Sequence, residues 1–171
     1  RCWNWHAPEN QGRGSGEAGM IAALTRHVIT LCNANRTRVY IAGISAGGAM
    51  AAIVGAAYPD LFVAVGVHSG VPRGDIRSLR AALAAMQGKA GAVPTARLPR
   101  QLPTIVFHGD QDKVVHPSNA GGFLHNLERA GMGPLTLRSL PGKSDGGRDF
   151  SRRVYQDGLG TVLLEDWTIH G

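Results

Sequence analysis

A serine occupies the centre of a G-x-S-x-G pattern, Gly43-Ile44-Ser45-Ala46-Gly47. Apolar residues 39–42 precede the pattern and an alanine-rich stretch follows it, which predicts a strand, a sharp turn and a helix. Glycines suit such a turn because it brings backbone segments together and leaves no room for a Cβ. The pattern therefore predicts a nucleophile elbow that exposes the hydroxyl of Ser45. The alternative is a glycine-rich turn with a bystander serine.

A serine nucleophile requires a base, usually a histidine that an acidic side chain orients. In elbow proteins the acid follows the serine in the chain, and the histidine follows the acid. Asp110 and Asp112 both come directly after the apolar residues 104–108, which predict a later strand. We favour Asp112, which lies further out in the loop and leads into Val114-Val115. Asp110 is expected to make a turn hydrogen bond to backbone.

Three histidines follow Asp112 in the sequence. His116 is too close to Asp112 to return to it as a separate element. His125 lies in the middle of a predicted helix and is expected on the surface. His170 follows the last predicted strand, so it is the fallback candidate for the base.

Strands and helices alternate along the chain, which predicts a mostly parallel α/β sheet. Apolar residues Met20, Leu24, Val28 and Leu31 recur at helical spacing in the first helix. Residues 71–103 contain several Gly and Pro breakers, and we interpret them as an insertion over the sheet's edge or active-site side. Helices are expected at about 16–32, 45–58, 76–87 and 118–130, strands at 39–42, 61–67, 104–108 and 161–169, and short antiparallel strands at 135–140 and 152–155.

The 171 residues suit one domain, and a hydrophobic content of 43% indicates a globular chain. No apolar run is long enough to span a membrane. The net charge of +6 comes from arginines scattered along the sequence. Nucleic-acid binding would concentrate such charge on one face, so a basic solvated surface without a nucleic-acid partner is expected. The chain starts without Met and stops close to a predicted strand, so we expect a piece of a longer protein.

The two cysteines, Cys2 and Cys32, are either free thiols or partners in a disulfide. We favour a disulfide that ties the N-terminal segment to the end of the first helix. Closing that loop would stabilise the fold by about 3–4 kcal/mol. Trp3 and Trp5 have the spacing of one strand face, and they either belong to the core or line a binding cleft.

Several stretches together resemble the polyhydroxyalkanoate (PHB) depolymerase family of esterases, in the α/β-hydrolase superfamily. They keep the order found in that family and span nearly the whole chain. The resemblance implies that Ser45 is the nucleophile, Asp112 the acid, and the Ala46 N–H an oxyanion donor. The matching stretches are Cys2-Trp-Asn-Trp5, Gly16-Glu17, Arg38 to Met50, Tyr58-Pro-Asp-Leu-Phe62, Val67-His-Ser-Gly70, Val106 to Asp112 with His116-Pro117, and Trp167-Thr-Ile-His-Gly171.

The resemblance also implies that parts of the site lie outside these residues. The family's catalytic histidine belongs to a G-H-A-W stretch a few residues beyond the position of His170-Gly171. The first strands, with the H-G loop that supplies the second oxyanion donor, should precede Arg1. Residues 1–171 are therefore expected to form a single partial α/β-hydrolase domain, truncated at both ends and inactive alone, in which His170 is a neighbour of the base.

The function implied is that of a serine esterase that hydrolyses short-chain polyhydroxyalkanoate polyester or its oligomers through an acyl-enzyme. The alternatives are an acetylxylan or feruloyl-type carbohydrate esterase and, from another class, a non-catalytic binding module. The resemblance places Trp3 and Trp5 at the substrate cleft. It also supports secretion, and with it the Cys2–Cys32 disulfide. We expect no cofactor and no metal, and the oligomeric state is left open.

Overall fold

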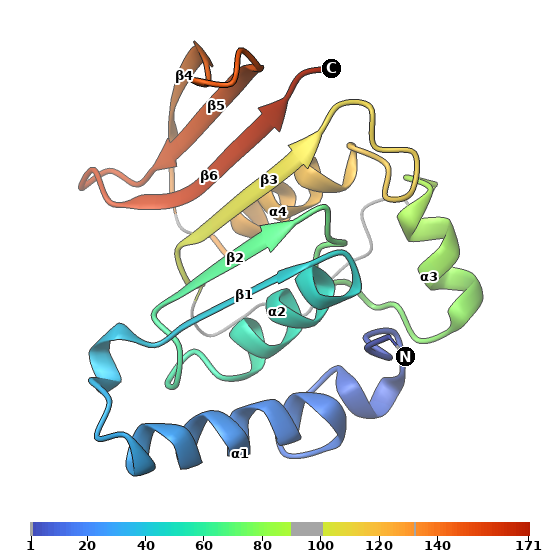
Figure 1. The fold of residues 1–171 in the computed structure, drawn as a ribbon, viewed down its shortest axis with the longest axis vertical. Coiled ribbons are helices and arrows are strands. Elements are labelled where there is room, and N and C mark those ends of the chain that lie inside the picture. The colour runs from blue at the N-terminus through green and yellow to red at the C-terminus, as the bar shows by residue number, and fades with distance from the viewer. Residues whose placement is uncertain (1, 90–100, 132) are drawn as a thin grey trace.

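One mixed sheet of six strands forms the centre of the molecule (Figure 1). The computed structural model describes residues 2–89, 101–131 and 133–171. Within these residues the strands lie in the order β1-β2-β3-β6-β5-β4. Their bounds are β1 (Tyr40–Ile44), β2 (Ala64–His68), β3 (Thr104–Gly109), β4 (Thr136–Lys143), β5 (Asp149–Gln156) and β6 (Val162–Ile169).

The sheet has a parallel part and an antiparallel part. Strands β1, β2, β3 and β6 run parallel, while β5 pairs antiparallel with both β6 and β4. The carboxyl ends of the four parallel strands therefore meet at one edge of the sheet (Figure 1). Loops at this edge carry the candidate catalytic residues, as is usual for open α/β sheets.

Four α-helices accompany the sheet in the described residues: α1 (Gly16–Leu31), α2 (Ala46–Ala57), α3 (Leu79–Met86) and α4 (Asn119–Arg129). Helix α2 packs on β1 and β2, and α4 packs on β3 and β6. Both lie behind the sheet in Figure 1, whereas α3 stands beside the carboxyl ends of the strands. Helix α1 packs against α2.

Small residues allow α2 to approach the sheet closely. A Cβ at Gly55 would overlap the side chain of Val65 on β2. The helix ends at Ala57, just before Pro59, which cannot continue it. Between α2, α4 and the sheet lies a closed apolar core, whose most buried side chains include Met50, Val54, Val67, Val106 and Leu164.

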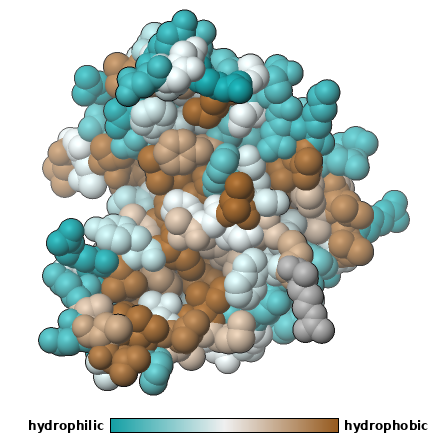
Figure 2. Space-filling view, in the orientation of Figure 1, coloured by the Kyte–Doolittle hydropathy of each residue, from teal (hydrophilic) through white to brown (hydrophobic). Residues whose placement is uncertain are grey.

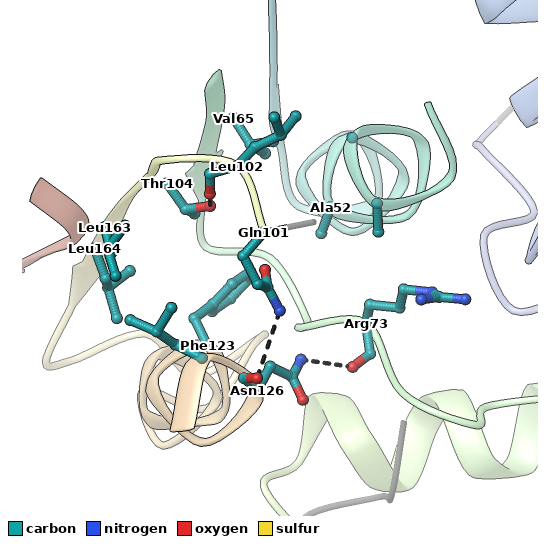
Figure 3. Close-up of a pocket in the computed structure, with 13 residues that line it drawn as sticks. Ala52, Val65, Arg73, Gln101, Leu102, Thr104, Phe123, Asn126, Leu163 and Leu164 are labelled. Atoms are coloured by element: carbon teal, nitrogen blue, oxygen red, sulfur yellow. Dashed lines mark hydrogen bonds between the residues drawn. The ribbon is translucent and has the colours of Figure 1, made fainter. Parts of the chain in front are cut away.

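A water-sized cavity of about 50 Å³ remains in this core (Figure 3). Phe123 of α4 and Leu164 of β6 line it together with the small residues of α2. At its margin the side-chain amide of Asn126 donates to the Arg73 carbonyl oxygen at 2.8 Å. The side-chain amide of Gln101 donates to the backbone carbonyl oxygen of Asn126 at 3.4 Å. These bonds tie α4 to the segment before α3 and to the residues before β3.

The elements expected from the sequence are present within a few residues of their expected bounds. Of the expected insertion at 71–103, residues 90–100 lie outside the described residues, and α3 is its helical part. Helix α1 starts directly after Ser15, but the Ser15 hydroxyl donates to the Glu9 carbonyl and does not cap the helix. Asn10 takes that role, because its Oδ1 accepts the Glu17 N–H at 2.6 Å.

The apolar stripe of α1, formed by Met20, Leu24, Val28 and Leu31, does not face the core. The helical spacing of these residues had suggested that it would. Helix α1 buries small residues such as Ala18 and Ala22 against its neighbours, while Leu24 is 61% exposed. The stripe borders a hollow between α1 and β1, which is the edge strand of the described sheet. Figure 2 shows apolar side chains gathered along this hollow. The exposed apolar residues of this stripe are Met20, Leu24, Val28 and Leu31 on α1, and the exposed Tyr40 of β1 lines the hollow opposite them.

The expected Cys2–Cys32 disulfide is absent, and both thiols are free and exposed. Cys2 lies near the start of α1, where it lines a groove together with Glu17 and Ile21. Cys32 caps the other end of the helix. A helix of 16 residues is about 24 Å long, whereas a disulfide requires Cα atoms within about 7 Å. The predicted disulfide was wrong because the length of α1 separates Cys2 from Cys32.

Within the described residues, no helix combines the length and the hydrophobicity that a membrane crossing requires. Nor do three or more His, Cys, Asp or Glu side chains gather there in a way that could hold a metal ion.

Candidate active site

Ser45 lies at the turn between β1 and α2, as the elbow pattern predicted. Its backbone has φ +54° and ψ −122°, in the positive-φ half of the Ramachandran plot that residues other than glycine rarely adopt. Such strain typically costs about 1–3 kcal/mol and is concentrated at functional sites. A Cβ at Gly43 would overlap the carbonyl group of Gly47, so the turn needs glycine there.

Ala46 begins α2 directly after Ser45. The first N–H groups of an α-helix have no acceptor within the helix and carry its partial positive charge. The carbonyl oxygen of Ser45 accepts the Ala49 N–H at 3.0 Å, which fixes the first turn of the helix. The Ala46 N–H thus belongs to a helix terminus beside the Ser45 side chain, where a developing oxyanion would be stabilised.

Asp112 lies in the loop after β3, held by its own backbone neighbours. Its Oδ1 accepts the N–H of Val114 at 2.9 Å and that of Val115 at 3.0 Å. Beneath the loop, the buried His108 donates its Nε2–H to the Val115 carbonyl at 2.8 Å. The same nitrogen lies 3.5 Å from Asp112 Oδ2. These contacts close the loop around the carboxylate, as the position of Val114-Val115 suggested.

Opposing effects act on the pKa of Asp112. Its side chain is 18% exposed, and burial alone would raise the pKa. The N–H groups of Val115 and Val114, and a hydrogen bond from the Ser69 hydroxyl, stabilise the carboxylate more strongly. The pKa of Asp112 therefore lies below its ordinary value, and the side chain is an anion at neutral pH.

A short chain of contacts joins the elbow to Asp112. The Ser45 N–H donates to the His68 carbonyl at 2.8 Å, which attaches the elbow to the end of β2. The next residue, Ser69, has φ +47° and reaches Asp112 with its hydroxyl. Sequence reasoning did not assign a role to Ser69, although it lies in the Val67-His-Ser-Gly70 stretch.

Asp110 contacts the chain that follows β6. Its Oδ2 accepts from His170 Nδ1 at 2.9 Å, and its Oδ1 accepts the Gly171 N–H at 3.1 Å. His170 Nε2 in turn lies 2.8 Å from the Ser151 hydroxyl. Asp110 bonds to backbone as expected, but the partner is the distant Gly171 and not a residue of its own turn, so the predicted turn bond was wrong. Asp110, and not Asp112, is the carboxylate beside His170.

The other two histidines after Asp112 make structural contacts. His116 Nδ1 accepts the Ser118 N–H at 3.2 Å, and the His116 N–H donates to the Met86 carbonyl at 2.7 Å. His125 lies on α4, where it lines a cavity behind α3. In the described residues, no histidine side chain makes a hydrogen bond with the hydroxyl of Ser45.

An apolar pocket of about 300 Å³ opens beside Ser45 and Ala46. Trp3 is 38% exposed and forms one wall, close to Gly47, while Trp5 is 6% exposed and belongs mainly to the core. Both tryptophans border the pocket in a turn, not on one strand face. Helix α3 and the loop after β3 complete the lining with Leu79, Ala82, Leu83, Met86 and Val115.

Polar contacts hold the tryptophan segment on the start of α1. The Asn4 N–H donates to Glu17 Oε2 at 2.7 Å, and Asn10 Nδ2 donates to the Asn4 carbonyl at 2.8 Å. These residues were not identified as part of the site from the sequence. The available signals were the Cys2-Trp-Asn-Trp5 and Gly16-Glu17 stretches, which contain Asn4 and Glu17 but do not reveal the contacts across the first turn of α1.

The fold and the elbow define the class of protein: the chain has a fold of the α/β-hydrolase type. An acetyl xylan esterase from Aspergillus awamori has the same fold, with a TM-score of 0.79 at 19% sequence identity. That superposition covers 99% of the present chain and 66% of the esterase.

The chain belongs to the PHB depolymerase family of esterases, because the family model described as "Esterase PHB depolymerase" matches residues 1–131. Poly(3-hydroxyalkanoate) depolymerase C of Paucimonas lemoignei is 29% identical over 100% of this chain and 43% of its own length. Feruloyl esterase B of Neurospora crassa is 34% identical over 92% of this chain and 59% of its own length. The chain therefore spans about half the length of these curated relatives.

Proposed function

We propose that the protein is a serine esterase in which Ser45 is the nucleophile and Asp112 the acid of the catalytic triad. The observation that carries this proposal is the strained backbone of Ser45 at the β1–α2 turn, beside an apolar pocket. Asp112 supports it, because its carboxylate is held at the same edge of the sheet and joined to the elbow through Ser69 and His68.

The proposed reaction begins when Ser45 Oγ attacks the ester carbonyl carbon while a histidine takes the hydroxyl proton. The Ala46 N–H stabilises the oxyanion of the tetrahedral intermediate. The ester C–O bond then breaks, the histidine returns the proton to the departing alkoxide, and an acyl-enzyme remains on Ser45. Water then attacks the acyl-enzyme through the same steps and releases the carboxylic acid product, which restores Ser45. Asp112 orients the histidine and stabilises its charged form.

We place the histidine in the segment that follows β6 in the longer protein, and the second oxyanion donor in a segment that precedes residue 1. His170 is engaged with Asp110 and Ser151, which argues against its use as the base. Asp110 is engaged at both carboxylate oxygens by distant residues, whereas both backbone hydrogen bonds of Asp112 in the described part of the chain are made by Oδ1, within its own loop. These contacts support Asp112 over Asp110 as the acid.

The proposed substrate is a short-chain polyhydroxyalkanoate polyester or its oligomers. The pocket beside Ser45 is lined mainly by Trp3 and by aliphatic side chains of α3, which suits an apolar acyl chain. The likeness to the depolymerase from Paucimonas lemoignei, which extends over the whole chain, supports the same class of substrate. Because a polymer of this kind cannot enter a cell, we propose an extracellular location.

A carbohydrate esterase that removes feruloyl or acetyl groups is the second candidate. Feruloyl esterase B has the higher identity of the two relatives, and a planar aromatic acyl group would also fit beside Trp3. A non-catalytic binding module, the candidate from another class, would not need the strained elbow at Ser45.

Hydrolysis by the full-length protein tests these candidates. Hydroxybutyrate oligomers, acetylated xylan and methyl ferulate are offered separately to the wild type, to Ser45→Ala and to Ser139→Ala. We expect release of hydroxybutyrate by the wild type and by Ser139→Ala, and none by Ser45→Ala. Ser139 is the matched control because it is an exposed serine on β4, at the opposite edge of the sheet from β1. Faster turnover of xylan or ferulate would favour the carbohydrate esterase, and turnover of no ester would indicate the binding module.

A further inference from the structure

Three side chains form a hydrogen-bonded relay at the end of β6, apart from the elbow. The Asp110 carboxylate accepts hydrogen bonds only, so the Nδ1 of His170 carries the proton in this pair. In the neutral ring Nε2 is then the acceptor, and the Ser151 hydroxyl donates to it. The relay Asp110–His170–Ser151 thus joins the loop after β3, the end of β6 and strand β5.

The same carboxylate also holds the backbone. While Asp110 Oδ2 binds the imidazole, its Oδ1 accepts the N–H of Gly171. Backbone bonds extend the sheet on both sides: the Asp110 N–H donates to the Ile169 carbonyl, and the His170 N–H donates to the Asp149 carbonyl, each at 2.9 Å. Together with the bond between Ser151 and His170, these make five hydrogen bonds that fix the direction in which the chain leaves β6. The lowered pKa of Asp110, caused first by His170 and then by Gly171, agrees with this arrangement.

The point where the chain leaves β6 lies beside the loop after β3, which contains both Asp110 and Asp112. Asp110 and Asp112 belong to the same turn, because the Asp112 N–H donates to the Gly109 carbonyl at 3.2 Å. A residue advances the chain by at most about 3.6 Å. A histidine a few residues beyond Gly171 can therefore reach Asp112 only if the chain leaves β6 in a suitable direction.

We propose that Asp110, His170 and Ser151 position the segment after β6, and with it the histidine that transfers the Ser45 proton. This inference rests on the proposed function. Asp110 and His170 act here as positioning residues, because they act through the chain that they hold. A shift of about 1 Å in a catalytic group can cost as much as about 100-fold in rate.

The test compares Asp110→Ala, Asp110→Asn and Asp112→Asn in the full-length protein, using the ester on which the wild type is active. Asp110→Ala should lower kcat about 10- to 100-fold with little change in KM. Asp110→Asn should restore kcat to within about threefold of the wild type, because the amide oxygen can accept the Gly171 N–H while the amide NH2 donates to Nδ1 of the other His170 tautomer. Asp112→Asn should lose about 10⁴-fold in kcat, as expected for a triad acid.

A double-mutant cycle adds a readout that does not depend on one variant. If the relay acts as a unit, Asp110→Ala and His170→Gln together should lower kcat no further than Asp110→Ala alone. Unchanged kcat in Asp110→Ala, or strictly additive losses in the cycle, would overturn the positioning role. A loss in Asp110→Asn as deep as that in Asp112→Asn would overturn it too, since Asp110 would then be the acid itself. Failure of the wild type to hydrolyse any ester contradicts the proposed function instead.

Discussion

The Ser45 N–H donates a hydrogen bond to the His68 carbonyl oxygen, 2.8 Å away, and this bond joins the elbow to the neighbouring strand. Beyond His68 the chain turns at Ser69, whose hydroxyl reaches the Asp112 carboxylate. The candidate nucleophile and the candidate acid are therefore linked through the neighbouring residues His68 and Ser69. Their relative position depends on the ends of three adjacent parallel strands, β1, β2 and β3.

Substitution of Gly43 should disturb the elbow more than it disturbs the rest of the fold. A Cβ in Gly43→Ala would overlap the carbonyl group of Gly47, so the turn must open. We expect a loss of about 1–3 kcal/mol in the free energy of unfolding and a larger proportional loss of esterase activity. Urea unfolding and ester hydrolysis by the full-length protein measure the two effects.

Gly121→Ala is the matched control for that experiment. Gly121 lies within α4, where an added Cβ would meet no atom within 4 Å. Alanine also favours helix over glycine by about 1 kcal/mol. This variant should therefore be as stable as the wild type or more so, with full activity. Equal activity in Gly43→Ala and Gly121→Ala would show that the tight turn at Ser45 does not matter for function.

The free energy of unfolding at acidic pH should depend on Asp112. Because its pKa is lowered in the folded state, its carboxylate contributes stability above the unfolded pKa of about 3.9. That contribution should be lost as the pH falls from about 5 through the folded-state pKa. Asp112→Asn should consequently have a shallower loss of stability between about pH 5 and pH 2. Parallel profiles for the two proteins, from urea unfolding at each pH, would contradict the hydrogen-bonded carboxylate.

The exposed apolar stripe of α1 leads to a prediction about the longer protein. We expect a segment preceding residue 1 to cover the hollow between α1 and β1, because Leu24 and Tyr40 are both more than half exposed there. If so, Leu24→Ala in the full-length protein should cost about 2–5 kcal/mol. Leu159→Ala, at a leucine that is 93% exposed in a turn, is the control and should change stability by less than about 0.5 kcal/mol. Equally small effects would mean that the stripe stays exposed.

Local sequence patterns predicted the elements and the elbow well. The spacing of Gly43, Ser45 and Gly47 determines a turn that depends on adjacent residues only. Periodicity identified α1 but not its buried side, because it shows which residues share a face and not which face a neighbour covers. The helix packs through Ala18 and Ala22 instead.

Longer-range contacts were beyond such patterns. The pairing of Asp110 with His170 depends on the register between β3 and β6, in which Gly109 lies opposite Ile169. The loop sequence alone suggested only that Asp110 would bond to backbone. Likewise, no local feature of Cys2 and Cys32 revealed that the length of α1 separates them.

The most direct test of the central claim is to identify the residue that a fluorophosphonate probe modifies in the full-length protein. Peptide mass mapping should locate the adduct on Ser45, with labelling lost in Ser45→Ala and retained in Ser139→Ala, at an exposed serine of β4. Asp112→Asn should slow labelling, because the histidine that activates Ser45 would lose its orienting anion. An adduct on any other residue, or undiminished labelling of Ser45→Ala, would contradict the assignment of Ser45 as the nucleophile.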